Sequence, residues 1–309
     1  MTKVFIDGSA GTTGLRIYER LEKRADLKLI ILPDEVRKDT DARREAINNA
    51  DIAFLCLPDA AAIEAVALLK NSNTAVIDTS TAHRTNPDWT YGFAELCGQY
   101  EKIKGSKRIA NPGCHASGFI ALVKPLISAG IIKAHTHLSC FSITGYSGGG
   151  KQMIAEYEAP ERNALLEAPR QYALTQQHKH LKEMVALTGL ENAPAFCPIV
   201  APFYSGMEVS VPLFASDIKG SISDICAIYK EYYKNGLVRF NDSADEGGFL
   251  SAAAYSMRDD MELSISGNEE RILLTARYDN LGKGASGAAI QNMNILIGAD
   301  EKTGLELGE

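Results

Sequence analysis

The sequence has no long run of any one kind of residue. No apolar stretch among its 309 residues approaches the roughly 20 residues that a membrane-spanning helix needs. The first residues, MTKVFIDGSAG, contain neither the apolar core nor the cleavage site of a signal peptide. Lys and Arg form no stripe that could follow a phosphate backbone, and the net charge is -7. We therefore expect neither a membrane nor a nucleic acid as partner.

Cysteine is present but lacks the spacing of a metal site. The six cysteines are scattered, form no CxxC pair and stand at no Cys/His spacing that suits zinc. The pattern predicts no metal and a location in the reducing cytoplasm. Most cysteines of this kind are small buried side chains, so a reactive one must be marked by its neighbours.

The first third of the chain contains four short apolar runs with helical patterns between them. The runs cover residues 4–6, 27–32, 52–57 and 75–77. They lack the alternation of a strand that has one face in water, and such strands are typical of a parallel sheet covered on both faces. We predict an α/β fold whose N-terminal part is a doubly wound, Rossmann-type dinucleotide-binding domain.

The pattern changes after Cys114. Residues 135–143 and 271–277 alternate between apolar and polar, and residues 200–213 form one long β-rich stretch. Alternation of this kind is typical of antiparallel strands with one solvated face. The sequence therefore predicts a second, α+β domain with a mixed or antiparallel sheet.

Two domains are the expected organisation of a chain of this length. With 45% hydrophobic residues it can bury a sizeable core, and it shows no internal repeat and no low-complexity linker. Residues 285–297 are small, apolar and helical in period, which would let them pack back on the first domain. We predict a dinucleotide-binding domain of residues 1–114, completed by 280–309, and a domain of residues 115–279 for catalysis, substrate binding and oligomerisation.

A glycine-rich loop lies between the first predicted strand and the first predicted helix. Its sequence, GSAGTTG at residues 8–14, has the spacing GxxGxxG. Glycine allows close approach of the backbone, and a helix N-terminus offers free N–H groups to a pyrophosphate. A glycine-rich turn also arises for steric reasons alone, but the strand before it and the helix after it favour a nucleotide. The expected cofactor contacts in this loop are Gly8, Ser9, Gly11, Thr12 and Thr13.

Basic residues follow the second predicted strand, where a dinucleotide-binding domain reads the ribose. An acidic pair, Asp34 and Glu35, is followed at once by Arg37 and Lys38. Cations at this place suit a 2'-phosphate, so the sequence favours NADP over NAD. The same residues are equally typical of the solvated start of a charged helix.

Cys114 stands out because of the residues around it. Asn111, Pro112 and Gly113 end a short predicted strand and turn the chain sharply, and a helical pattern begins at once. A thiol at a helix N-terminus has a lowered pKa and a larger thiolate fraction, as a covalent nucleophile requires. We therefore predict that Cys114 is a nucleophile at the rim of a site.

Several stretches along nearly the whole chain resemble one enzyme family. They are FIDGSAGTTGL at residues 5–15, NPGCHASGF at 111–119, TGYSGGGK at 144–151, HKHL at 178–181 and DNLGKGASGAAIQNMN at 279–294. They are similar to the short form of the N-acetyl-gamma-glutamyl-phosphate reductases of arginine biosynthesis. His115 and Ser117 depart from the aromatic residue and the threonine common in the long form, and Lys182 departs from a frequent proline. None of these departures touches the nucleophile.

The resemblance implies a reaction and its catalytic residues. An acyl phosphate would be reduced by NADPH, through a thioester on Cys114, to N-acetyl-glutamate semialdehyde. One of two histidines would act as acid and base; the family's spacing from the preceding tyrosine selects His178, with His180 as the alternative and otherwise a substrate contact. The two histidines could also ligate a metal, but no third ligand accompanies them. The family further implies a homo-oligomer, either a dimer or a tetramer.

The resemblance also indicates the remaining contacts. The loop at residues 145–151 is either a flexible turn or a backbone cradle for an anion. As a cradle it would hold the substrate through Ser147, Gly148 and Lys151. The turn at residues 279–284 resembles the family's loop on the nicotinamide side. Three further expected cofactor contacts are Ser80, Asn280 and Lys283.

Two other functions fit the same residues. An aspartate-semialdehyde dehydrogenase has a similar fold and similar thioester chemistry, and its substrate differs by one methylene and the acetyl group. Physical reasoning from the residues does not separate the two enzymes, although the family-like stretches favour the acetylated substrate. A non-catalytic dinucleotide-binding regulator with a relic site is the other alternative, and the intact Cys114 and the paired histidines argue against it.

Overall fold

The computed structural model describes residues 1–308, which form two compact units. The first unit comprises Met1–Pro112 and Ala285–Leu305, and the second comprises Gly113–Gly284 and the residues from Glu306 on. The limits predicted for the functional domains remain predictions, because compactness assigns no function to either unit.

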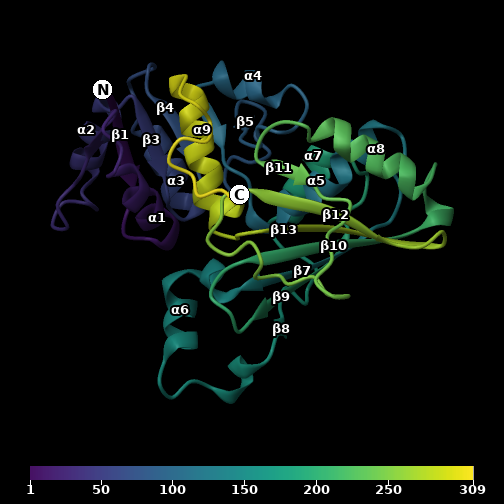
Figure 1. Ribbon diagram of the computed structural model, residues 1–309. Coiled ribbons are helices and arrows are strands. Elements are labelled where there is room, and N and C mark those ends of the chain that lie inside the picture. Colours follow the sequence, from purple (N-terminus) through teal and green to yellow (C-terminus); the bar gives the residue numbers. More distant parts are fainter. Residues whose placement is uncertain (309) are drawn as a thin grey trace. The chain divides into compact units, whose positions relative to one another are not determined.

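The first unit contains a six-stranded, wholly parallel sheet in the order β2-β1-β3-β4-β6-β5 (Figure 1). The strands are β1 (Thr2–Asp7), β2 (Leu27–Ile30), β3 (Ile52–Leu55), β4 (Ala75–Asp78), β5 (Thr90–Tyr91) and β6 (Arg108–Ala110). The helices are α1 (Thr12–Leu21), α2 (Thr40–Asn49), α3 (Asp59–Ala67), α4 (Gln99–Lys104) and α9 (Gly287–Ile297). Helices cover both faces of the sheet, which confirms the predicted doubly wound fold.

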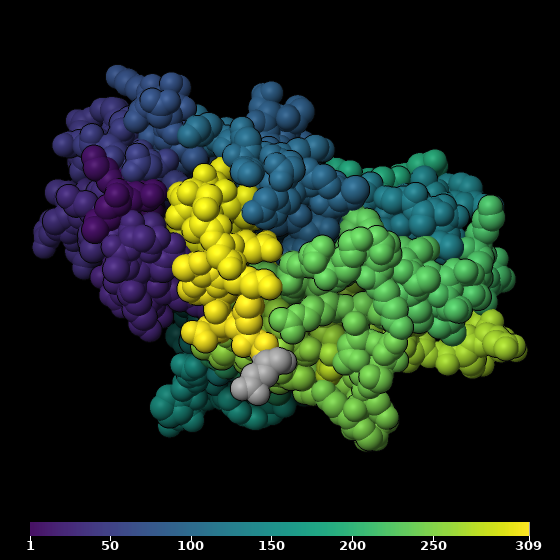
Figure 2. Space-filling view, turned by 45° about the horizontal axis from the view of Figure 1, so that its top comes forward, coloured from purple at the N-terminus to yellow at the C-terminus, as the bar shows by residue number. Residues whose placement is uncertain are grey.

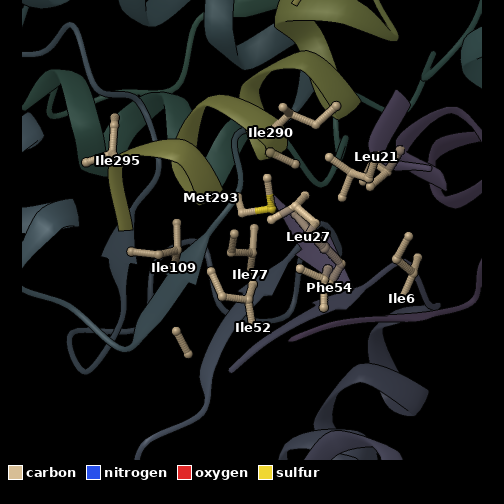
Figure 3. Close-up of a cluster of buried hydrophobic side chains, with 14 of the residues drawn as sticks. Ile6, Leu21, Leu27, Ile52, Phe54, Ile77, Ile109, Ile290, Met293 and Ile295 are labelled. Atoms are coloured by element: carbon tan, nitrogen blue, oxygen red, sulfur yellow. The ribbon is translucent and has the colours of Figure 1, made fainter. Parts of the chain in front are cut away.

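Successive side chains of β1 enter two different cores. Ile6 belongs to a cluster with Ile290 and Met293 of α9, on the face that α1 also covers (Figure 3). Phe5 belongs to a second cluster with Ile47 of α2. Because both faces are covered, every residue of β3 and β4 is buried. This double burial is the reason why the strands appear in the sequence as continuous apolar runs.

Helix α9 belongs to the first unit although it follows nearly all of the second unit in the sequence. It contacts α1, α4 and β4, and Figure 2 shows it in yellow between the purple N-terminal segment and the blue segment that contains α4. Asn292 ties the helix to the sheet, since its Nδ2 donates to the Gly92 carbonyl at 2.9 Å and to Asn111 Oδ1 at 3.1 Å.

The second unit contains a seven-stranded sheet in the order β11-β12-β13-β10-β7-β9-β8. The strands are β7 (Ser139–Gly145), β8 (Arg170–Gln171), β9 (Ala195–Ala201), β10 (Met207–Phe214), β11 (Val238–Phe240), β12 (Met261–Gly267) and β13 (Arg271–Tyr278). The helices are α5 (Cys114–Ser128), α6 (Gly150–Glu158), α7 (Leu181–Thr188) and α8 (Ile222–Tyr232). Two strand pairs, β11 with β12 and β7 with β9, are parallel and the others antiparallel, so the predicted mixed sheet is confirmed.

One face of this second sheet is covered by helices. Helix α5 packs on β10 and β13, and α7 and α8 pack on α5 (Figure 1). Tyr233, which directly follows α8, donates its hydroxyl to the Ala121 carbonyl in α5 at 2.7 Å. The residues on this face are buried, as Val209 and Ala276 show, whereas Phe141 and Leu273 on the other face are exposed.

The expectation of one long β-rich stretch at residues 200–213 is wrong. Strand β9 ends at Ala201 and β10 begins at Met207. Gly206, in the turn between them, has a φ of +110°, and a Cβ there would lie 2.6 Å from the Ala252 carbonyl oxygen. Apolar and buried residues alternate in the same way in both strands, so the sequence alone reads as one stretch. The turn between them is imposed by tertiary contacts.

Candidate active site

Cys114 is the first residue of α5. The residue before it, Gly113, is extended (φ -79°, ψ 142°) and provides no side chain to cap the helix. The Gly113 N–H donates to Oε2 of Glu183 at 3.1 Å. The hydroxyl of Tyr278 donates to the Cys114 carbonyl at 2.6 Å and accepts the Gly118 N–H at 2.9 Å. Cys114, the predicted nucleophile, therefore lies at an uncapped helix N-terminus, half-buried, on a backbone fixed from two sides.

Two histidines, His178 and His180, lie around His115, the residue that follows Cys114. The ring centroid of His115 lies 5.8 Å from that of His178 and 5.6 Å from that of His180, and the last two lie 4.7 Å apart. Phe196 of β9 packs on His115 and His178. The structure thus brings both histidines predicted from the sequence to the segment that carries the nucleophile.

The two predicted histidines have different surroundings. His178 is half-buried, and its Nδ1 accepts the backbone N–H of His180 at 3.1 Å. His180 is buried, and its Nε2 lies 4.0 Å from Oε1 of Glu183. Glu183 is only 1% exposed and also binds the Gly113 N–H. One carboxylate therefore contacts both the loop before Cys114 and an imidazole. Sequence reasoning did not assign Glu183 to the site, although its position three residues after His180 could have indicated this contact.

His115 is itself held by two hydrogen bonds. Its Nδ1 lies 2.6 Å from Ser142 Oγ, and its Nε2 lies 2.7 Å from the hydroxyl of Tyr172. Burial, together with the charge that His178 would carry, lowers the pKa of His115 to about 3. The ring is therefore neutral at physiological pH, with one nitrogen a donor and the other an acceptor.

The segment predicted to hold the substrate forms a 3-10 turn (Tyr146–Gly149), which contains Gly148, and the start of α6. Ser147 is buried, and its Oγ accepts the Asn280 side-chain N–H at 2.9 Å. Asn280 Oδ1 accepts the Gly206 N–H at 2.9 Å. Lys151 is exposed on α6 and forms no hydrogen bond or ion pair with residues 1–308. The structure therefore joins Ser147 to Asn280 by a hydrogen bond. Lys283, three residues after Asn280, is buried.

The glycine loop of the first unit needs its glycines. Gly8 has a φ of +86°, and a Cβ there would lie 2.3 Å from the Cys56 carbonyl oxygen. A Cβ on Gly14 would lie 2.4 Å from the Gly8 carbonyl oxygen. No side chain caps α1, and within the described residues Thr12 Oγ1 is buried without a hydrogen-bond partner. Free N–H groups and a spare hydroxyl at a helix N-terminus fit a phosphate group.

A cavity of about 550 Å³ lies beside this loop. Its volume is within the roughly 300–1,000 Å³ of typical ligand pockets. Gly8 lines it, together with the polar residues Asp7, Ser9, Asp34, Arg37, Lys38 and Arg43. Both basic residues predicted to read the ribose thus line the cavity, whereas Ser80 follows β4, where its Oγ donates to Asp78 Oδ2 at 2.7 Å. Gly11, Thr12 and Thr13 belong to the loop but are not among the lining residues.

Arg43 is a third cation of the cavity that sequence reasoning did not assign to the cofactor. Its Nε and Nη2 donate to Asp7 Oδ2 at 3.0 and 2.9 Å. Asp7 is 4% exposed; burial raises its pKa, and Arg43 opposes this rise. Arg37, in contrast, has an exposed partner, Asp34, at 3.5 Å. Arg43 is therefore the most firmly positioned of the three cations.

Residues 1–308 contain no group of three or more His, Cys, Asp or Glu side chains that could hold a metal ion. In the same part of the chain no helix has the length and apolar character to cross a membrane.

The chain matches two family models in succession. Residues 3–105 match the NAD binding domain of semialdehyde dehydrogenase, and residues 114–280 match the dimerisation domain of semialdehyde dehydrogenase. The chain is 45% identical to an N-acetyl-gamma-glutamyl-phosphate reductase of Brucella ovis, over 96% of this chain and 99% of that one. It is 42% identical to an N-acetyl-gamma-glutamyl-phosphate reductase 2 of a Nostoc species, over 98% and 99%.

Solved structures share the fold at low sequence identity. An aspartate semialdehyde dehydrogenase II of Vibrio cholerae is similar with a TM-score of 0.73 at 16% identity, over 96% of this chain and 98% of that chain. An aspartate semialdehyde dehydrogenase of Francisella tularensis gives a TM-score of 0.71 at 14% identity, over 96% and 100%. The two family models and the relatives at 42–45% identity show that the chain belongs to the semialdehyde dehydrogenase family and, within it, to the N-acetyl-gamma-glutamyl-phosphate reductases.

Proposed function

We propose that the chain reduces N-acetyl-gamma-glutamyl phosphate to N-acetyl-glutamate 5-semialdehyde with NADPH and releases phosphate. The observation that carries this proposal is Cys114 at the uncapped N-terminus of α5, followed directly by His115, whose ring packs on His178 and His180. The names of the relatives at 42–45% identity support the acetylated substrate over aspartyl phosphate. A reduced thiol and a phosphorylated metabolite suit the cytoplasm, which we propose as its location.

In the first chemical step the Cys114 thiolate attacks the acyl carbon. A carbon–sulfur bond forms, the bond from the acyl carbon to the phosphate oxygen breaks, and phosphate leaves. Backbone N–H groups at the start of α5 would stabilise the oxyanion that develops on the acyl oxygen. NADPH would supply a hydride to the carbon of the resulting thioester, and a proton on its oxygen would complete a hemithioacetal. Loss of the hydroxyl proton then expels the Cys114 thiolate and releases the aldehyde.

His178 is the group that we propose to move these protons, with His180 as the alternative. His178 Nδ1 accepts a backbone N–H, so the proton of the neutral ring lies on Nε2, from which it can be given. His180 lies beside the carboxylate of Glu183. If His178 moves the protons, His180 would contact the substrate. Ser147, Gly148 and Lys151 remain proposed substrate contacts.

NADP would be held by the first unit. The glycine loop would bind the pyrophosphate through Gly8, Ser9, Gly11, Thr12 and Thr13. Arg37 and Lys38 would pair with the 2'-phosphate, because both line the cavity beside that loop. The proposed cofactor contacts elsewhere in the chain are Ser80, Asn280 and Lys283.

A direct assay tests the proposed reaction. Oxidation of NADPH is followed with N-acetyl-gamma-glutamyl phosphate and, in parallel, with beta-aspartyl phosphate. We expect turnover with the first and little with the second, and none with Cys114→Ser, since a hydroxyl is a far weaker nucleophile at neutral pH. Faster turnover of aspartyl phosphate would contradict the substrate assignment. Activity in Cys114→Ser would contradict the thioester.

We also propose that two copies associate through the helix-free face of the second sheet. This face carries exposed apolar side chains on neighbouring strands: Phe141 is 45% exposed, Phe214 60% and Leu273 37%. It lies in the part that matches a dimerisation domain. Sedimentation should show a homo-oligomer for the natural chain and monomers for Phe141→Asp with Phe214→Asp. An unchanged sedimentation coefficient in that variant would exclude this face.

A further inference from the structure

Three hydrogen-bonded side chains of the second unit form a series through the residue that follows Cys114. It runs from Ser142 of β7 through His115 of α5 to Tyr172, which follows β8. His115 directly follows Cys114 in the sequence. At this position the long form of the family commonly has an aromatic residue. The contacts of His115 therefore indicate what the histidine contributes here.

The donor and the acceptor in each of these two hydrogen bonds can be assigned from the Ser142 hydroxyl, which needs an acceptor for its hydrogen. Ser142 is fully buried, and within residues 1–308 His115 Nδ1 is the only hydrogen-bond partner of its hydroxyl. If His115 carried its proton on Nδ1, the Ser142 hydroxyl hydrogen would be buried without an acceptor, which is costly. Ser142 therefore donates to Nδ1, and the imidazole proton lies on Nε2. His115 Nε2 then donates to the oxygen of Tyr172.

This direction leaves the hydroxyl hydrogen of Tyr172 available. The ring is 36% exposed, so the hydrogen can meet a group in the site. A hydroxyl whose oxygen already accepts a hydrogen bond is also a stronger donor. Tyr278, the other tyrosine beside the nucleophile, lacks this freedom, because its hydroxyl already donates to the Cys114 carbonyl and accepts the Gly118 N–H.

Tyr172 is held in place by its backbone as well. Its N–H donates to the Pro198 carbonyl at 3.0 Å. In the turn after it, Ala173 and Gln176 have φ values of +52° and +56°, which are uncommon for residues other than glycine. The Gln176 side chain clamps that turn, donating to the Phe196 carbonyl at 2.7 Å and accepting its N–H at 2.8 Å. Backbone strain kept in this way is typical of functional sites.

The geometry points to the Tyr172 hydroxyl as a hydrogen-bond donor to the Cys114 thiolate, with His115 and Ser142 as the positioning residues that turn its hydrogen toward the sulfur. This inference rests on the proposed role of Cys114 as nucleophile and adds a group that keeps it ionised. Burial and the negative charge of Cys114 both raise the pKa of Tyr172, so the phenol remains a donor when the thiol has ionised. The burial-lowered pKa of His115 keeps the imidazole neutral, as the relay requires.

Other titratable groups face residues 113–115 or adjoin residues that do, and they would also act on a Cys114 thiolate. They come from the 178–180 segment, from α7, from β13 and from the turn after β13: His178, His180, Glu183, Tyr278 and Lys283. The test must therefore compare variants that leave these groups unchanged.

The test measures alkylation of Cys114 by iodoacetamide as a function of pH, in the protein without substrate or cofactor. Modification is followed on the Cys114 peptide by mass spectrometry, because five other cysteines can react, and Cys114→Ser verifies the peptide signal. Tyr172→Phe and His115→Phe should raise the midpoint of the profile by about one pH unit, which makes alkylation below the midpoint about tenfold slower. Ser142→Ala should shift it in the same direction but less, since His115 can then change tautomer.

Tyr100→Phe is the matched control, because Tyr100 on α4 is 37% exposed and lies in the other unit. It should leave the profile unchanged. A Tyr172→Phe profile that superimposes on that of the natural chain would overturn the inference, and a shift in Tyr172→Phe without one in Ser142→Ala would overturn the relay. The result is independent of the proposed function: an unshifted profile in an active reductase refutes only this inference, and a shifted profile in a chain inactive on the acyl phosphate refutes only the reductase.

Discussion

His178 and His180 are two residues apart but offer different chemistry. His178 is half-buried and has a backbone N–H on Nδ1, which fixes its tautomer. His180 is buried near the Glu183 carboxylate, which would stabilise its charged form. A group that alternately gives and takes a proton needs access to the substrate as well as a suitable tautomer, and the half-buried ring meets both needs.

His178→Asn should therefore lower turnover by roughly 100- to 10,000-fold, because asparagine can form a hydrogen bond but cannot carry the proton. The affinity for substrate should change much less, and the acidic limb of the pH-rate profile should disappear. Steady-state kinetics of His178→Asn and His180→Asn across pH decide between the two rings. An inactive His180→Asn beside a normally active His178→Asn would reverse the assignment.

The three cations of the cavity should contribute differently to cofactor binding. Arg37→Ala with Lys38→Ala should remove the preference for NADPH over NADH, a change in the ratio of dissociation constants of about 10- to 100-fold if one charge-assisted bond is lost. Arg43→Gln should weaken both cofactors, because it leaves the buried Asp7 carboxylate uncompensated next to Gly8. Fluorescence titrations of both variants test this. A double variant that retains the natural ratio would show that these two residues do not read the 2'-phosphate.

At the scale of single elements, α8 is secured by a capping box. The Ser221 hydroxyl accepts the Asp224 N–H, and the Asp224 carboxylate accepts the Ser221 N–H at 2.8 Å. Ser221→Ala should lower the free energy of unfolding by about 1 kcal/mol. Denaturant unfolding measures this difference, and Ser216→Ala, outside the helix, is the control. A loss equal to that of the control would mean that the cap does not contribute.

The elements that could be predicted are those with their own pattern. The buried strands β1, β3 and β4 appear as apolar runs because both faces of their sheet are covered. Strands β5 and β8 have two residues each, too few for any period, and they exist only because a neighbouring strand pairs with them. The break between β9 and β10 is also imposed from outside, by the packing of Gly206 against Ala252.

The candidate site divides in the same way. Cys114 is a candidate from the sequence because Pro112 and Gly113 predict a turn into a helix, and HKHL resembles a known stretch. Glu183, Tyr172 and Ser142 are candidates only from the structure, since each contacts a residue distant in the sequence. The pairing of Arg43 with Asp7 is likewise a tertiary contact across 36 positions. Sequence patterns identify residues whose neighbours in the sequence are distinctive, whereas the hydrogen-bond and ion-pair partners of those residues are known only from the fold.

For the whole molecule, His115 gives stability a pH dependence. Its pKa is about 3 in the folded chain against 6.5 in an unfolded one, so its contribution is complete above pH 6.5 and is lost as the pH falls toward 3. In that window the natural chain should lose up to about 1.4 kcal/mol per pH unit more than His115→Phe. Urea unfolding of both proteins at several pH values measures the slopes. Parallel slopes would show that His115 takes up its proton without unfolding.

Phosphate release in a single turnover without NADPH is the most direct test of a Cys114 thioester. Enzyme is mixed with N-acetyl-gamma-glutamyl phosphate, released phosphate is counted, and the protein is digested for mass spectrometry. We expect a burst of one phosphate per active site, an acyl group on Cys114, and neither in Cys114→Ser. Absence of the burst, or an acyl group on another residue, would contradict catalysis through a Cys114 thioester.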